Sequence, residues 1–151
     1  MIQMISTYLI SVHPTWASAF FLSHNAKTIE LRKNSFGASL KSGDNIAIYA
    51  TLPVAEVIGI VKVVKRESLP IARLWRESEQ GQLARVSREQ FNAYYANQKS
   101  GIGVWVGAAK LLPIPIALSQ LRKNWGQRWQ PPQQIQQLTS EQMETALNIG
   151  H

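Results

Sequence analysis

Cysteine is absent from the 151 residues, and charged residues make up only 17% of them. Without cysteine the chain can form no disulfide, no thiolate nucleophile and none of the cysteine-based zinc sites that stabilise many small domains. No run approaches the ~20 apolar residues of a membrane-spanning helix, and no basic segment leads into an apolar stretch at the N-terminus. We therefore expect a soluble, cytoplasmic protein that does not enter a membrane.

Common catalytic and nucleotide-binding motifs are also missing. The sequence has no Gly-x-Ser-x-Gly, no His-Glu-x-x-His and no glycine-rich phosphate loop. Three histidines without cysteine or clustered carboxylates make a poor metal site. We therefore expect no metal and no cofactor, and any active site would be one without a known sequence signature.

Basic residues are what the chain carries in excess. Sixteen Lys and Arg against nine Asp and Glu give a net charge of +7 and a pI of about 10.0. Every Lys and Arg lies between Lys27 and Arg128. Such an excess attracts polyanions such as RNA, but it is also common in small proteins that bind no nucleic acid, so charge alone leaves both interpretations open.

The hydrophobic pattern predicts one domain over residues 1–151, in which strands and helices alternate. Strands are expected at 7–12, 27–32, 45–50, 54–64 and 102–112, and helices after Pro14, over 68–80, after Ser87, over 117–123 and over 139–148. Ser87 and Thr139 each begin a capping-box pattern that ends in Gln. Gly59 suggests a bend or bulge in its strand. The stretch 113–138 is expected to be a wrapping loop.

Two of these strands place polar side chains together. In the strand 27–32, Thr28, Glu30 and Arg32 share one face. In the strand 45–50, Tyr49 lies on a face that ends polar, at Thr51. A cation, a carboxylate, an aromatic ring and hydroxyls on neighbouring strands could together hold a phosphate and the edge of a base.

Three segments in this order resemble the ASCH branch of the PUA-like superfamily. They are Leu9-Ile10-Ser11-Val12-His13-Pro14, Lys27-Thr28-Ile29-Glu30-Leu31-Arg32, and the Gly43-Asp44 turn with the strand that follows it to Thr51. The Lys-Thr-x-Glu-x-Arg segment followed by Gly-Asp is the most specific part. Later segments, including the turn Pro131-Pro132-Gln133, resemble a prokaryotic subgroup often described as transcriptional regulators.

The resemblance implies an α+β fold: a small, partly closed β-barrel decorated by helices, with a cleft beside the first helix and second strand. The cleft would take RNA, single-stranded nucleic acid or a nucleobase-like ligand. Lys27 and Arg32 would bind phosphate there, while Glu30, Tyr49, Thr51 and Gln133 would read a base. Trp16 and His13, at the first helix, complete the candidate set. The expected function is therefore an RNA-, nucleotide- or modified-base-binding domain, with a regulatory role as the subgroup implies.

Each candidate also has an ordinary structural interpretation. Arg32 could simply pair with Glu30 or Asp44, and Trp16 could belong to the core. His13 could be an ordinary residue at a helix end. Outside this set, Trp125 and Trp129 stand among the cations of the 113–138 stretch, where they could bind single-stranded nucleic acid or clamp the loop to the sheet.

The alternative function is that of a small metal-independent hydrolase, acting on RNA as a ribonuclease or on a modified nucleoside. Lys27 and Glu30 would then be the catalytic pair. Some ASCH relatives hydrolyse an acetylated cytidine with a Lys, a Thr nucleophile two residues before an Arg, and a later Glu. Lys27 matches that Lys, but Glu30 stands at the nucleophile's position, and this departure counts against the reaction.

Overall fold

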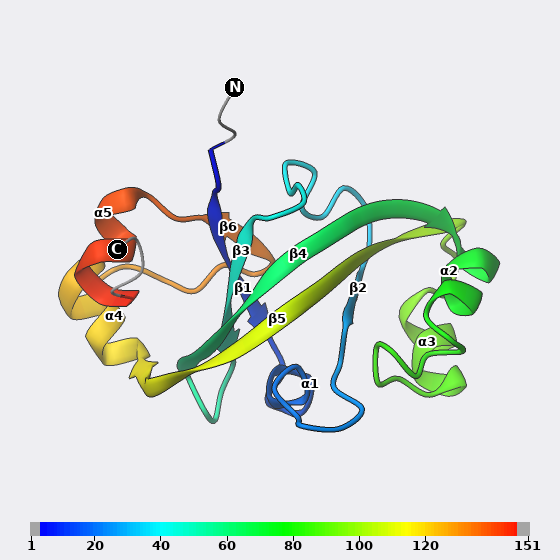
Figure 1. Ribbon diagram of the computed structural model, residues 1–151, viewed down its shortest axis with the longest axis horizontal. Helices are drawn as coiled ribbons and strands as arrows, with labels where there is room; N and C mark the ends of the chain where they lie inside the picture. Colours follow the sequence, from blue (N-terminus) through cyan, green and yellow to red (C-terminus); the bar gives the residue numbers. More distant parts are fainter. Residues whose placement is uncertain (1–3, 148–151) are drawn as a thin grey trace.

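The computed structural model describes residues 4–147. A strongly curled sheet extends across the molecule, with helices at its ends (Figure 1). Its six strands lie in the order β2-β5-β4-β3-β1-β6, and β1 and β3 are its parallel pair. The strands are β1 Thr7–Val12, β2 Ile29–Arg32, β3 Asn45–Ala50, β4 Glu56–Pro70, β5 Ser100–Ala117 and β6 Ile135–Gln137. The sheet and the helices around it form the α+β half-barrel that the sequence predicts.

Short helices decorate the ends of this half-barrel. They are α1 Pro14–Ala19, α2 Ile71–Glu77, α3 Arg88–Tyr94, α4 Leu118–Trp125, α5 Ser140–Gln142 and the π-helix η1 Met143–Leu147. Both predicted capping boxes are present, at Ser87 and at Thr139. None of the helices within residues 4–147 has the length and apolar character needed to cross a bilayer.

The strands β1 and β3 are buried on both faces. Their residues Ile10 and Ile48 belong to the cluster inside the curl, together with Phe20 of the segment after α1. Leu9 and Tyr49 point the opposite way, into a second apolar cluster that α4 and η1 cover. The face of β3 that we expected to be polar is therefore buried, because the C-terminal helices pack on it.

The long antiparallel pair of β4 and β5, which α2 and α3 connect, curls strongly across the molecule (Figure 1). The pairing shifts register at three places, and the first of these is at Gly59, where a bulge was predicted. A β-carbon on Gly59 would lie 2.5 Å from the ring of Phe21, so the glycine allows this ring to pack against the strand. The strand β4 continues to Pro70, past the expected start of a helix at residue 68, because it stays paired with β5 as far as Ser100.

The stretch 113–138 has more regular structure than a wrapping loop. The strand β5 runs through Pro113 to Ala117, and α4 and β6 follow. Proline is tolerated in this part of β5 because β2 pairs only with 102–105, and because the register of β5 against β4 passes from Leu111 to Ile116, so that Pro113 has no partner in either pairing. The terminal helix is α5 followed by η1 up to Leu147, and the expected end at residue 148 lies outside the described residues.

Candidate functional site

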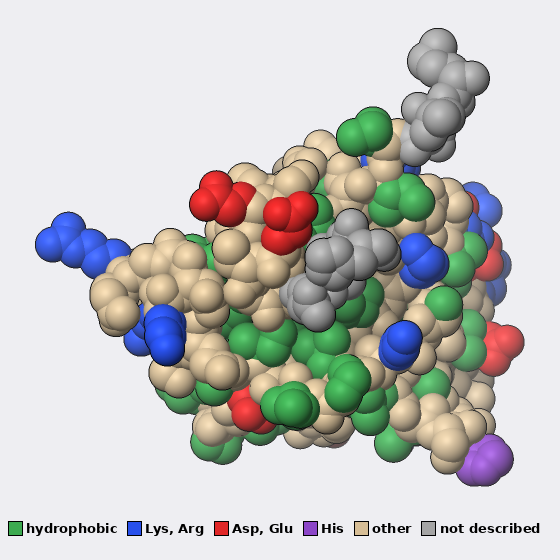
Figure 2. Space-filling view, turned by 60° about the vertical axis from the view of Figure 1, so that its left-hand side comes forward, with side chains coloured by type: hydrophobic (Ala, Val, Ile, Leu, Met, Phe, Trp, Pro, Cys, Tyr) green, Lys and Arg blue, Asp and Glu red, His purple; other side chains and the backbone are tan. Residues whose placement is uncertain are grey.

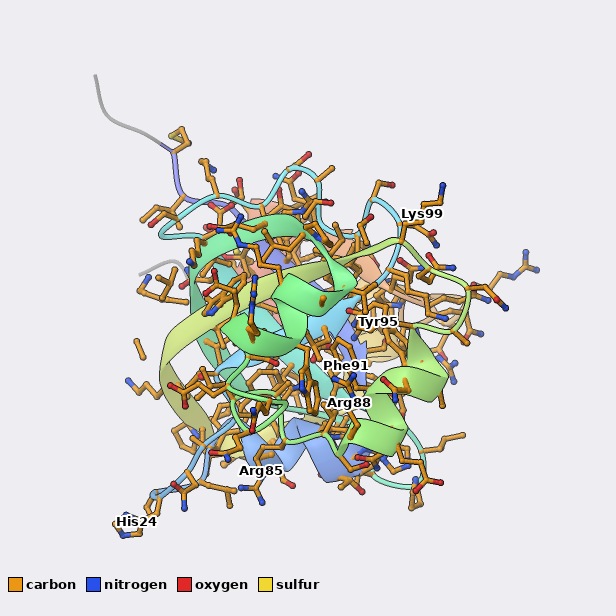
Figure 3. The ribbon with its side chains drawn as sticks, turned by 90° about the vertical axis from the view of Figure 1, so that its right-hand side faces the viewer. His24, Arg85, Arg88, Phe91, Tyr95 and Lys99 are labelled. Atoms are coloured by element: carbon orange, nitrogen blue, oxygen red, sulfur yellow. The ribbon has the colours of Figure 1, made fainter. Side chains whose placement is uncertain are left out.

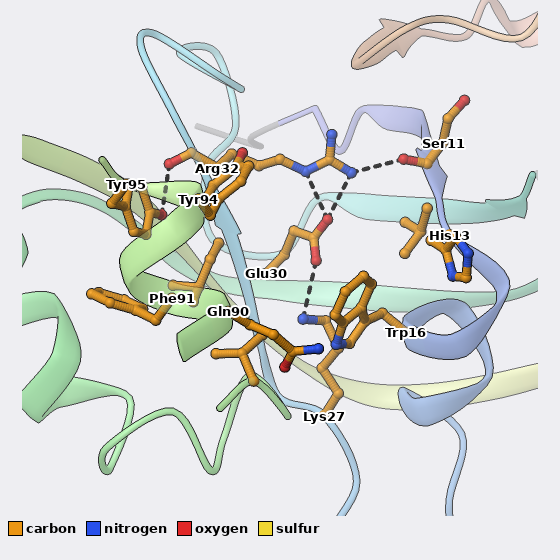
Figure 4. A pocket seen from close by; sticks show the side chains of 13 residues that line it. Ser11, His13, Trp16, Lys27, Glu30, Arg32, Gln90, Phe91, Tyr94 and Tyr95 are labelled. Carbon is orange, nitrogen blue, oxygen red and sulfur yellow. Dashed lines mark hydrogen bonds and ion pairs between the residues drawn. The ribbon is translucent and has the colours of Figure 1, made fainter. Parts of the chain in front are cut away.

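A cavity of about 280 Å³ opens between α1, β2 and α3 (Figure 4). Five of the predicted site residues line it: His13, Trp16, Lys27, Glu30 and Arg32. The other lining residues are Ser11, Val12, Leu31, Val86, Gln90, Phe91, Tyr94 and Tyr95. The end of β1, helix α1 and strand β2 thus form one side of the cavity, and α3 forms the other.

Three charged side chains form a buried network at the floor of this cavity. The Lys27 Nζ lies 3.2 Å from Glu30 Oε1 and donates a hydrogen bond of 3.0 Å to the Ala84 carbonyl. The Arg32 Nε and Nη2 both lie 2.7 Å from Glu30 Oε2, and Nη2 also donates to the Ser11 carbonyl at 2.8 Å. Lys27 and Glu30 are only 4% and 5% exposed. Of the structural pairings considered for Arg32, the one with Glu30 is present.

The network keeps Glu30 ionised. Burial alone would raise the pKa of Glu30, but the charges of Lys27 and Arg32 and their hydrogen bonds outweigh burial and lower it. Burial lowers the pKa of Lys27, and the attraction of Glu30 opposes this. With all three groups charged, the floor of the cavity carries one net positive charge.

Acid should destabilise the fold through Glu30. Because its folded pKa lies below the ordinary value of 4.5, the unfolded chain binds a proton first as the pH falls, and the stability that the carboxylate contributes is lost below about pH 4.5. We expect the free energy of unfolding, from urea titrations at several pH values, to decline in this range more steeply than in Glu30→Gln. Equal slopes in the two proteins would contradict the ionised state assigned to Glu30.

Aromatic rings form the walls of the cavity. Trp16 stands on the α1 side, and its Nε1 donates to the Arg85 carbonyl at 2.9 Å. Phe91, Tyr94 and Tyr95 come from α3 and the residue after it, and the Tyr95 hydroxyl donates to the Arg32 carbonyl at 2.8 Å. In Figure 3, Phe91 and Tyr95 lie at the end of the molecule where α2 and α3 pack. Rings on opposite sides of one space can hold a planar ligand between them.

Sequence reasoning missed the α3 wall. The capping box at Ser87 located the helix and the spacing of its aromatic residues, but it gave no sign that the helix lies beside β2. That position follows from the pairing of β2 with β5, which begins shortly after α3. Gly101 contributes as well, because a β-carbon there would lie 2.6 Å from the Tyr95 ring.

One irregular segment, residues 83–85, positions three parts of the cavity with consecutive carbonyl groups. The Leu83 carbonyl accepts from the backbone N–H groups of Thr28 and Ile29, at 2.8 and 3.2 Å. The next two carbonyls hold Lys27 and Trp16, as described above. The start of β2, the lysine and the tryptophan are thus fixed by the same short stretch of backbone.

Three predicted site residues lie outside this cavity. Tyr49 is 3% exposed in the apolar cluster on the opposite face of the sheet. Thr51 lies in the turn after β3, where its N–H donates to the Val12 carbonyl at 3.0 Å. Gln133 is exposed in the segment before β6, next to Pro132, whose carbonyl accepts from the Ser11 hydroxyl at 2.6 Å.

The two C-terminal tryptophans act as a clamp. The rings of Trp125 and Trp129 meet edge to face at 4.9 Å, and the Trp125 Nε1 donates to the Gln142 carbonyl at 3.0 Å. Arg122 donates to the Trp129 carbonyl at 3.0 Å. The contacts of Trp125 and Trp129 agree with the clamping interpretation of this pair. On the face of the molecule in Figure 2, Lys and Arg are scattered rather than gathered into one patch.

Among solved structures, the ASCH protein of Zymomonas mobilis superposes on this chain with a TM-score of 0.84 and 26% sequence identity, covering 95% of this chain and 94% of that one. The chain has the ASCH-domain fold. The resemblance seen in the sequence, and the PUA-like fold class with it, are confirmed. A search of family models and of curated proteins gave no match.

Two other solved structures have a lower sequence identity to this chain, and their likeness to it shows a similar fold and nothing more. The N-terminal domain of Staphylothermus marinus McrB has 11% identity and a TM-score of 0.61, with 99% of each chain covered. Human THYN1, solved in complex with DNA containing 5-methylcytosine, has 16% identity and a TM-score of 0.53, covering 92% of this chain and 94% of that one.

Proposed function

We propose that the cavity binds a nucleobase, presented by RNA, by another single-stranded nucleic acid or by a nucleotide or modified nucleoside. The observation that carries this proposal is the position of Arg32. Its guanidinium is held rigidly by Glu30 and Ser11 at the floor of a cavity whose walls are aromatic. A fixed cation between rings suits a planar, polar ligand.

The size of the cavity supports a small ligand. Pockets for drug-sized molecules usually span about 300–1,000 Å³, and this one, at about 280 Å³, lies just below that range. A single base or nucleoside suits such a volume, and the rest of a polymer would lie outside it. The net charge of +7 favours a ligand that carries phosphates.

A fold neighbour gives further support. Human THYN1 was solved with DNA containing 5-methylcytosine, so a protein of this fold can contact a nucleic acid. We extend that property to this chain as a proposal, together with the regulatory role and the cytoplasmic location that the sequence suggested.

The contacts favour binding over hydrolysis. Lys27, the base that a hydrolase would use, already donates to Ala84 and pairs with Glu30. Among the lining residues, the hydroxyl of Ser11 is engaged with the Pro132 carbonyl, and that of Tyr95 with the Arg32 carbonyl. The Tyr94 hydroxyl has no such bond among the described residues, but burial raises its pKa and so disfavours the phenolate that would attack a substrate.

Tryptophan fluorescence tests this proposal directly. We expect single-stranded RNA, single-stranded DNA or a nucleoside to quench the emission saturably, because a base would stack against Trp16. Binding of a polymer should weaken between about 50 and 200 mM salt, whereas binding of an uncharged nucleoside should not.

Two variants show which tryptophan reports the binding. In Trp16→Phe most of the ligand-induced change should disappear. In Trp129→Phe, which alters the clamp on the opposite face, the change should persist. Quenching that survives in Trp16→Phe and is lost in Trp129→Phe would refute the proposed site.

A further inference from the structure

The carboxylate, amide and imidazole acceptors around the cavity are already in use within the protein, which leaves hydroxyl oxygens as the other side-chain acceptors in its lining. Both carboxylate oxygens of Glu30 receive hydrogen bonds or ion pairs from Lys27 and Arg32. The Gln90 Oε1 accepts from the Ser87 N–H at 2.9 Å, in the capping box of α3. The His13 Nδ1 accepts from the Thr15 N–H at 3.2 Å, where His13 caps α1. Glu30, Gln90 and His13 thus use these acceptor atoms to hold the local structure in place.

The same side chains leave hydrogen-bond donors for a ligand. Among the described residues, the bonds of Arg32 involve Nε and Nη2, so that both N–H groups of Nη1 remain, on the side of the guanidinium that faces away from Glu30 (Figure 4). The capping bond of Gln90 uses its oxygen, which leaves the amide nitrogen. A neutral His13 whose Nδ1 accepts carries its proton on Nε2. In Figure 4, Gln90 points from α3 toward Trp16 and Lys27, across the cavity from β2.

We infer that the cavity selects a base whose inner edge carries a carbonyl oxygen, and discriminates against one that carries an amino group there. This inference rests on the proposed function. A carbonyl would accept from the Arg32 guanidinium or the Gln90 amide. An amino group in the same place would face these donors, and the side-chain acceptors left for it in the lining are the hydroxyl oxygens of Ser11, Tyr94 and Tyr95. Sites that leave a buried polar group unpaired discriminate strongly between otherwise similar ligands.

A phosphate oxygen is also an acceptor, but the walls of the cavity favour a base. Trp16 on one side and the aromatic residues of α3 on the other offer flat apolar faces. A tetrahedral phosphate would leave these faces uncovered, and it would meet a floor with only one net positive charge. A planar ring covers the faces and brings its carbonyl to Arg32 in the same pose.

Two matched pairs of bases test the inference. Inosine and adenosine differ by a carbonyl against an amino group on the purine ring, and uridine and cytidine differ in the same way on the pyrimidine ring. In each pair the neighbouring ring nitrogen also changes, from an N–H donor in the carbonyl member to an acceptor in the amino member. Affinities should be measured by calorimetry, for the nucleosides and for short single-stranded RNAs of the same bases. We expect the carbonyl member to bind at least tenfold more tightly in the pair whose ring fits the cavity.

The outcomes separate the inference from the function on which it rests. Equal or tighter binding of the amino member would overturn the inference and leave the proposed function standing. If none of the ligands binds, the proposed function fails, and the inference with it. Inorganic phosphate should not displace the bound base. Displacement by phosphate would show that the cavity takes a phosphate oxygen, and this would also overturn the inference.

A variant with a matched control tests the donor on α3. Gln90→Glu keeps an oxygen for the Ser87 N–H, as a capping box permits, but replaces the amide donor with an acceptor. We expect the preference for the carbonyl member to fall at least threefold. Gln142→Glu makes the same change in the Thr139 capping box of α5, at the other end of the molecule (Figure 1), and should leave the preference unchanged. An unchanged preference in Gln90→Glu, with thermal unfolding like that of the control, would overturn the role assigned to this amide.

Discussion

Replacing Glu30 with Gln is expected to lower the free energy of unfolding by about 3–5 kcal/mol, as is typical when one partner of a buried ion pair is removed. Lys27 is 4% exposed, and its charge would keep no carboxylate partner. A glutamine offers one oxygen in place of two, and its amide nitrogen would face a cation. Urea denaturation at neutral pH, followed by circular dichroism, measures the loss.

An exposed ion pair provides the control. Glu67 lies 3.4 Å from Lys65, and both side chains are more than a third exposed. Solvent screens such a pair, so Glu67→Gln should change the free energy of unfolding by less than about 1 kcal/mol. A loss of similar size in Glu30→Gln would contradict the picture of a buried charged network, because it would mean that water reaches Lys27 and Arg32 freely.

The sequence was most informative where local chemistry decides the structure. The alternation in 27–32 placed Glu30 and Arg32 on one face, and both residues do line the cavity. The capping boxes at Ser87 and Thr139 were predicted correctly, because a hydroxyl and an amide three residues apart satisfy backbone N–H groups without help from the rest of the fold.

The same methods failed where distant segments meet. The alternation of β3 correctly separated Ile48 from Tyr49, but it could not show that α4 and η1, from the end of the chain, would bury the Tyr49 face. Thr51 was assigned from the polar end of the same strand face and Gln133 by resemblance, and both lie outside the cavity lining. Burial depends on which elements pack together, and strand period alone does not encode that.

The α3 wall illustrates the problem for the site itself. Tyr95 is 63 residues from Arg32 in the sequence, yet its hydroxyl donates to the Arg32 carbonyl. The register of β2 against β5 helps to bring α3 beside β2, and register between strands so far apart in the sequence cannot be read from either strand alone. The hydrogen bonds that the carbonyl groups of 83–85 accept are harder still to predict, because the side-chain pattern does not tell where a backbone carbonyl points.

Replacing Arg32 with Lys should weaken binding of the preferred base by about 10- to 100-fold, since a hydrogen bond to a charged group contributes about 1.5–3 kcal/mol. A lysine keeps the charge, but its ammonium cannot hold Glu30 and Ser11 and still offer the two N–H groups of Nη1. Calorimetric titration with the preferred nucleoside measures the change, and circular dichroism establishes that the variant is folded.

A second arginine with a similar set of contacts serves as the control for this substitution. Arg122 donates through Nε to the Trp129 carbonyl and through Nη2 to the Gln130 side chain, both at 3.0 Å, but it lies on α4, away from the cavity. Arg122→Lys should therefore leave the affinity unchanged, even if it loosens the clamp of Trp125 and Trp129. Equal affinities in Arg32→Lys and Arg122→Lys would mean that the guanidinium of Arg32 serves only to position Glu30, and that the base is read elsewhere.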